Sequence, residues 1–258
     1  MHDSDDAWSD RSAHGDDAGW MREAIVLARA VRGWVWPNPP VGCVIVRDGN
    51  LIGRGRTQFG GRPHAERVAL DDAGDQAEGG TLYVTLEPCC HWGKTPPCAD
   101  AIIEAGIRKV FASLQDPDPR VNGGGLRKLR EAGVEVEVGL GKIEAGQIMA
   151  GFFHRIATGQ PIVTIGDLSE DLSLIPDGYD AVLRSGPDRL WLSTRAQDVG
   201  VLVRQVRDPG EPFGRLLSEL GEMGLTNVFI PSCDLIVPRL ATVQNRGTEC
   251  HAPGPVVR

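Results

Sequence analysis

Helical and extended patterns alternate along residues 21–140, and this alternation restricts the fold more than any other feature of the chain. Residues 21–33 carry apolar side chains at helical spacing, and the apolar runs 41–46 and 51–56 flank an Asp-Gly turn that predicts a β-hairpin. Three helix–strand units follow, with helices at 64–74, 98–106 and 124–133 and strands at 81–86, 107–114 and 134–140. This order predicts an α/β fold, a three-layer α/β/α sandwich around a mixed sheet.

A change in pattern after residue 140 predicts a second domain. A connecting helix is expected over 141–157, and a new segment starts at residue 159. Beyond it we expect strands at 189–193 and 227–232 and a helix at 213–224, enough for a smaller α/β domain. We therefore assign 1–19 to a disordered acidic tail, 20–147 to the first domain and 148–258 to the second.

Composition and charge exclude several classes of function. The formal net charge of −8 and the lack of a basic stripe argue against a nucleic-acid or anionic-membrane binder. The chain has no secretory leader and no apolar run of about 18 residues that could span a bilayer. Three of the six cysteines lie within residues 89–98, a spacing that suits metal ligation in a reducing compartment better than disulfides. We expect a cytoplasmic protein.

One histidine and two cysteines form a candidate zinc site. His64, Cys89 and Cys98 each lie where a loop meets an expected helix, and zinc prefers nitrogen and thiolate donors. Glu66 lies two residues beyond His64, where a carboxylate can exchange a proton with water at such a site. The alternative is a purely structural zinc site, with Cys90 as the fourth ligand.

Zinc nucleobase deaminases typically carry an H-x-E motif followed by P-C-x-x-C. The chain has the H-x-E and the P-C, but eight residues separate Cys89 from Cys98 in place of the usual two. The loop between these cysteines carries His91, Lys94 and Thr95. An imidazole, an ammonium and a hydroxyl beside the metal favour binding of an anion such as a substrate phosphate.

The chain contains the segments "PHAERVAL" (63–70), "TLEPCCHWGKTPPC" (85–98), "DPDPRVNGGG" (116–125) and "PNPPVGCVIVRDG" (37–49). Together these four segments resemble the deaminase half of the bifunctional riboflavin-biosynthesis deaminase/reductase family. The resemblance covers roughly residues 21–160. It implies a cytidine-deaminase-like fold and zinc-dependent hydrolytic removal of an amine from 2,5-diamino-6-ribosylamino-4(3H)-pyrimidinone 5′-phosphate.

The resemblance also implies residue roles. It makes His64, Cys89 and Cys98 the zinc ligands and Glu66 the proton carrier, and it places Asn38, His91, Lys94 and Asp116 at the substrate site. The family often reads D-P-N-P where this chain has Asp116-Pro-Asp118-Pro, so a contact from an asparagine amide there is in question.

The second half departs from the resembled family, in which a reductase domain of about two hundred residues uses NADPH. Only about a hundred residues remain here, without the expected lysine and glycine after residue 164 or a glycine pair after the last strand. We expect a shortened reductase-like domain without reductase activity or NADPH, and a separate enzyme for the reduction. The domain could serve packing or homo-oligomerisation, or bind another ligand.

Two other functions stay open on the sequence. The chain could deaminate a different amine-bearing heterocycle in a side pathway. It could also be a pseudoenzyme or regulatory protein that keeps zinc only for stability.

Overall fold

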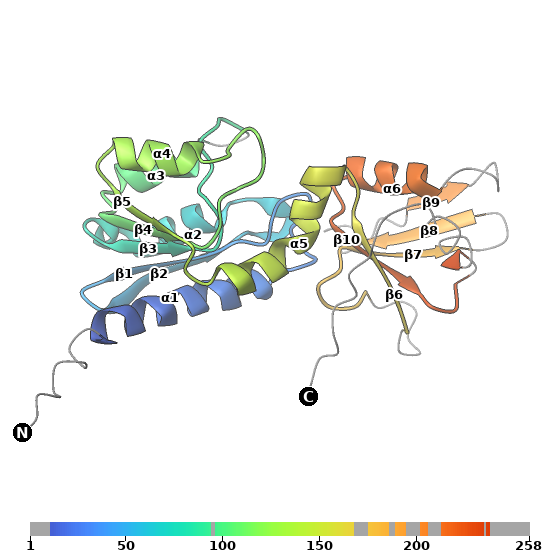
Figure 1. The fold of residues 1–258 in the computed structure, drawn as a ribbon, viewed down its shortest axis with the longest axis horizontal. Helices are drawn as coiled ribbons and strands as arrows, with labels where there is room; N and C mark the ends of the chain where they lie inside the picture. The colour runs from blue at the N-terminus through green and yellow to red at the C-terminus, as the bar shows by residue number, and fades with distance from the viewer. Residues whose placement is uncertain are drawn as a thin grey trace, which may run out of the picture.

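The computed structural model describes residues 11–93, 96–167, 175–185, 189–194, 202–205, 213–234 and 236–237. These residues form two five-stranded sheets, and a long helix joins one sheet to the other (Figure 1).

The first sheet has the strand order β2-β1-β3-β4-β5. Its strands are β1 (Gly42–Arg47), β2 (Asn50–Arg56), β3 (Thr81–Val84), β4 (Lys109–Ala112) and β5 (Glu135–Val138). β1 pairs antiparallel with β2 and β3, whereas β3, β4 and β5 run parallel. Asp48 and Gly49 both have positive φ in the β1–β2 turn, as a tight hairpin requires.

Helices cover both faces of this sheet. They are α1 (Arg11–Arg29), α2 (Ala65–Ala73), α3 (Cys98–Glu104), α4 (Gly124–Glu131) and α5 (Lys142–Thr158), with short 3₁₀ turns η1 (Phe59–Gly61) and η2 (Gly74–Ala77). α1 and the first part of α5 cover one face, and α2, α3 and α4 cover the other (Figure 1). The predicted α/β/α sandwich is confirmed. In the described part of the chain, none of the helices is both long and apolar enough to cross a membrane.

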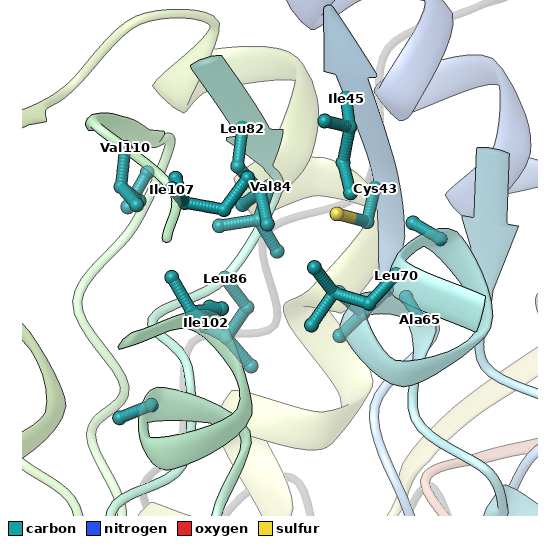
Figure 2. Close-up of a cluster of buried hydrophobic side chains, with 14 of the residues drawn as sticks. Cys43, Ile45, Ala65, Leu70, Leu82, Val84, Leu86, Ile102, Ile107 and Val110 are labelled. Atoms are coloured by element: carbon teal, nitrogen blue, oxygen red, sulfur yellow. The ribbon is translucent and has the colours of Figure 1, made fainter. Parts of the chain in front are cut away.

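Side-chain alternation along the strands builds a core on each face. Cys43 and Ile45 of β1 point toward α2, where Leu70 packs, whereas Val44 and Val46 face α1 (Figure 2). Because both faces are covered, β1 and β3 are buried along nearly their whole length.

The first helix differs from the sequence prediction. α1 begins at Arg11 rather than near residue 21, so residues 11–19, assigned to the disordered tail, are helical. Within this extension the Tyr83 hydroxyl donates a hydrogen bond to Asp17 Oδ1, which connects the acidic segment to β3. Residues 1–10 lie outside the described part.

The second sheet has the order β6-β10-β7-β8-β9. Its elements are β6 (Ile162–Gly166), β7 (Ala181–Ser185), β8 (Arg189–Thr194), β9 (Leu202–Gln205), α6 (Phe213–Glu222) and β10 (Asn227–Pro231). β6, β10 and β7 are parallel, and β8 pairs antiparallel with β7 and β9. The sequence predicted β8, β10 and α6, placed only an unassigned new segment at β6, and missed β7 and β9.

α5 belongs to both halves of the chain. The predicted boundary between residues 147 and 148 falls inside this helix. Met149 packs into the first core, and a Cβ on Gly151 would lie 2.3 Å from the Asn227 side chain in the second half. The two sheets are therefore joined by a packed helix, and the change from one to the other comes after Thr158.

Candidate functional site

His64, Cys89 and Cys98 converge as the sequence predicted. His64 lies at the N-cap position of α2, Cys98 is the first residue of α3, and Cys89 lies in the loop after β3. The His64 Nδ1 is 3.7 Å from Cys89 Sγ and 3.4 Å from Cys98 Sγ. The ligand atoms of the three residues all lie within 4.8 Å of one another, an arrangement that can hold a metal ion.

Backbone contacts fix the first cysteine relative to the second. The Cys98 N–H donates to Cys89 Sγ at 3.3 Å, and the Ala99 N–H donates to the Cys89 carbonyl at 3.1 Å. A hydrogen bond from the Cys98 side chain lowers the pKa of the Cys89 thiol to about 4, while the same bond and burial raise the pKa of Cys98. The site therefore favours a thiolate at Cys89, which is the form that binds metal.

Within the described residues, no fourth histidine, cysteine or carboxylate joins this group. Cys90, the alternative fourth ligand, points elsewhere, with its Sγ 3.8 Å from the carbonyl oxygen of Arg120. Three protein ligands with one open position are typical of a catalytic zinc site, whereas structural sites close with four.

Glu66 lies in the first turn of α2 and is only 4% exposed. Burial raises the pKa of its carboxyl group to about 7. Such a group can both accept and release a proton near neutral pH, which general acid–base catalysis requires.

These residues open onto a cavity of about 350 Å³. Of the residues predicted for the site, the cavity is lined by Asn38, His64, Glu66, Cys89, His91 and Asp116, while Cys98 is buried behind them. Lys94 and Thr95, predicted to bind substrate, lie outside the described residues.

The three predicted substrate residues that are described differ in their hydrogen bonding. The Asn38 amide donates to the Gly61 carbonyl. His91 has a buried Nδ1 that makes no hydrogen bond to any of the described residues. Asp116 accepts the N–H of Asp118 at 2.9 Å, and burial raises the pKa of Asp116 to about 6. His91 thus lines the cavity with one ring nitrogen unpaired among the described residues.

An ion pair in the cavity wall resolves the question about the D-P-D-P segment. Arg120 donates to both carboxylate oxygens of Asp118, with Nε 2.9 Å from Oδ1 and 3.1 Å from Oδ2, and thereby lowers the pKa of Asp118. A paired carboxylate therefore occupies the position where the resembled family often has an amide. The sequence signal for this ion pair is an arginine two residues after the aspartate.

Glu87 was also missed, although a carboxylate at the end of a buried strand is itself a signal. Its side chain is 3% exposed and accepts the N–H groups of Asp116 (3.1 Å), Gly123 (2.9 Å), Gly125 (2.9 Å) and Leu126 (3.2 Å). It thereby ties the segment before Cys89 to the start of α4 and to the loop that carries Asp116.

Two further arginines, Arg62 and Arg155, line the cavity and were not predicted. Arg62 directly precedes the Pro63-His64 segment, and Arg155 comes from the last turn of α5, far from the motifs in sequence. No local pattern indicated that α5 would reach the cavity.

Comparison with known sequences places residues 15–114 in the cytidine and deoxycytidylate deaminase zinc-binding region. The chain is 47% identical over 149 residues to riboflavin biosynthesis protein RibD of Aquifex aeolicus, a match over 58% of this chain and 42% of that protein. It is 51% identical over 149 residues to the Escherichia coli protein of the same name, covering 58% and 41% of the two chains. The chain spans less than half the length of these relatives.

Solved structures extend the similarity. Acinetobacter baumannii RibD is 30% identical, with a TM-score of 0.68 over 85% of this chain and 81% of that one. The diaminohydroxyphosphoribosylaminopyrimidine deaminase/5-amino-6-(5-phosphoribosylamino)uracil reductase of Thermotoga maritima is 28% identical, with a TM-score of 0.71 over 84% and 81%. Because residues 1–160 are less than two thirds of this chain, both matches include part of its second half.

Proposed function

This chain belongs to the riboflavin-biosynthesis deaminase/reductase family, as its motifs predicted, and from that membership we propose that it is a zinc-dependent deaminase of riboflavin synthesis. The proposed substrate is 2,5-diamino-6-ribosylamino-4(3H)-pyrimidinone 5′-phosphate, and the proposed reaction replaces its exocyclic amine by oxygen with release of ammonia.

The observation that carries the proposal is the convergence of one imidazole and two thiols beside a buried carboxylate at a cavity. The donor set of His64, Cys89 and Cys98 fits zinc, because nitrogen and sulfur ligands in a group of three suit that ion. When bound, zinc acidifies water and polarises the group under attack. The remaining chemistry belongs to the chain itself.

Glu66 is the proposed proton carrier. It lines the cavity two residues from His64, within the wall that also holds Cys89. In the proposed reaction its carboxylate accepts one proton from the attacking water and passes it to the ring nitrogen, and then carries the second water proton to the departing amine. The proton count balances, because one water proton stays on the ring nitrogen of the product and the other leaves in ammonia with the two hydrogens of the amine.

Asn38, His91 and Asp116 are the proposed substrate contacts among the described residues, with Lys94 and Thr95 proposed for the same role. The lining of the cavity by the first three and the free ring nitrogen of His91 support this assignment. Asp116, with a raised pKa, can donate or accept a hydrogen bond to an amide-like ring edge.

The second half, proposed as residues 148–258, is a shortened reductase-like domain without reductase activity. The Pro231-Ser232-Cys233 segment at the end of β10 supports the lack of reductase activity, because a glycine pair would be needed there to admit cofactor phosphates. The homo-oligomer, the cytoplasmic location, the independence from NADPH and the separate reductase stay predictions.

The test measures zinc content and ammonia release from the phosphorylated pyrimidine, with and without NADPH. The Glu66→Gln variant should keep one zinc per chain and lose roughly 10²- to 10⁴-fold in rate, the usual contribution of a positioned acid–base group. Asp71→Asn is the matched control in the same helix, because it changes only an exposed pair with Arg67.

Unchanged ammonia release by Glu66→Gln would contradict the proposed role of this residue. A wild-type protein that holds zinc but releases no ammonia would favour a zinc-stabilised pseudoenzyme. Release from another amine-bearing ring, but not from this pyrimidine, would favour the side-pathway alternative.

A further inference from the structure

Arg155 brings a cation into the deaminase cavity from the helix that joins the two halves. It lies in the last turn of α5 and lines the same cavity as His64 and Glu66. Its Nη2 donates to the Pro37 carbonyl at 2.9 Å, and its Cζ lies 5.8 Å from the centre of the Phe152 ring. These two contacts hold the guanidinium in place.

One nitrogen of this guanidinium has no acceptor. The Arg155 Nε is buried and makes no hydrogen bond with the part of the chain that the structure describes. Asp118 and Asp180 attract the Arg155 charge through space, but neither accepts a hydrogen bond from Nε. A buried donor without a partner destabilises the folded protein. Because the Arg155 side chain lines the cavity, an anion bound there can balance its charge and accept hydrogen bonds from its guanidinium.

Arg120, in the same cavity wall, is different. Its guanidinium is already engaged by both oxygens of Asp118. The charge of Arg120 is therefore largely balanced within the protein, whereas Arg155 lines the cavity and makes no ion pair with a carboxylate of the described residues. A guanidinium is a permanent cation whose planar N–H groups match the oxygens of a phosphate.

We propose that Arg155 binds the phosphate monoester of the substrate and so sets the preference of the deaminase for a phosphorylated pyrimidine; this inference rests on the proposed function. Arg155 then acts as a specificity-determining residue contributed by α5, outside the motifs that form the zinc site. Through Nη2 the same side chain holds Pro37, next to Asn38, so its loss could also move that loop.

The experiment separates phosphate binding from loop positioning by comparing two substrates. Ammonia release is measured with the phosphorylated pyrimidine and with its dephosphorylated form. The ratio of the two kcat/KM values should fall by roughly 10- to 100-fold in Arg155→Gln, the usual effect of losing a hydrogen bond to a charged group. Arg155→Lys, which keeps the charge, should recover part of the ratio.

Arg32→Gln is the matched control. Arg32 also has a buried Nε that no described residue accepts from, but it packs against Gly178 and does not line the cavity. Its substitution should leave the substrate ratio unchanged. Equal losses on both substrates in Arg155→Gln would overturn the proposal in favour of a positioning role, and so would an unchanged ratio.

Binding of ribose 5-phosphate, measured by calorimetry, tests Arg155 independently of catalysis. The wild type and Arg32→Gln should bind it alike, and Arg155→Gln at least roughly tenfold more weakly. Equal affinity of all three, or no binding by the wild type, would overturn the proposal. If no pyrimidine is deaminated, the proposed function fails, yet this measurement still decides the role of Arg155.

Discussion

Replacing Glu87 by Gln should destabilise the protein strongly, although the change removes no atoms from the metal site. The two oxygens of Glu87 divide four backbone N–H groups between them: Oε2 accepts from Asp116 and Gly123, and Oε1 from Gly125 and Leu126. The last two N–H groups belong to the first turn of α4, where no carbonyl of the helix can accept them. One carboxylate therefore accepts hydrogen bonds both from the first turn of α4 and from the loop that carries Asp116.

The expected loss of stability follows from the way the two carboxylate oxygens share the four N–H groups. The amide oxygen of Gln can accept for one pair of N–H groups, but its NH₂ would face the other pair donor to donor. Two buried N–H groups left without acceptors cost about 1–3 kcal/mol each, so the loss is about 4 kcal/mol. This is a large part of the roughly 5–15 kcal/mol that stabilises a typical domain. At about 2–4 °C per kcal/mol, the melting temperature should fall by about 8–16 °C.

Thermal unfolding by circular dichroism, together with zinc analysis of the same samples, tests this prediction. Glu131→Gln is the matched control, because it makes the same change at an exposed position near the end of the same helix. It should shift the melting temperature by less than about 2 °C, as exposed substitutions usually do. Equal shifts in the two variants would refute the assignment of Glu87 as a buried acceptor for four N–H groups.

Two further predictions concern the cavity wall and its support. Burial raises the pKa of Asp116 to about 6, so this group stabilises the folded state most below the usual carboxyl pKa, and that contribution is lost as the pH rises through 6. The Asp116→Asn variant does not titrate at this position and can still accept the N–H of Asp118. Its unfolding free energy, measured by urea titration, should therefore rise by about 2 kcal/mol relative to that of the wild type between pH 4 and pH 7. A difference that stays constant over this range would contradict the raised pKa. Gly224→Ala would place a Cβ 2.4 Å from Pro37 Cβ, at a residue with φ of 95°, so it should raise the KM of the deaminase with zinc content unchanged. Gly214→Ala, where no atom lies within 4 Å, is the control, and equal KM values for both variants would show that this contact does not shape the site.

The first domain could be predicted because its signals are local. Each helix and strand from 21 to 158 carries its own periodicity, and the strands alternate between two covered faces. The second sheet was harder because β7, its central strand, has only three buried apolar residues before Arg184. The helical start of α1 was missed because acidic composition indicated a tail, whereas the contact from Tyr83 to Asp17 joins residues distant in sequence.

Within the candidate site, too, the residues with local sequence signals could be predicted and those that act through distant contacts could not. His64, Glu66, Cys89 and Cys98 fall in two short motifs whose residue types state their chemistry, so sequence alone was enough to group them. Glu87 and Arg155 act on partners that lie tens of residues away along the chain. Their roles depend on which loops the fold brings together, and a residue type at one position does not carry that information.

The packing between the halves indicates that the second half supports the loop that carries Asn38. Pro37, which precedes Asn38, lies between the Arg155 side chain and Gly224, and Trp36 packs into the core of the second half. A Cβ at Gly33 would lie 2.5 Å from the carbonyl oxygen of Tyr179, so the backbones of the two halves meet on this side as well. The loop that carries Asn38 is thus held from both directions. The second half would be required to hold this loop whether or not it binds a cofactor, and a rise in KM in Gly224→Ala is the result that this explanation requires.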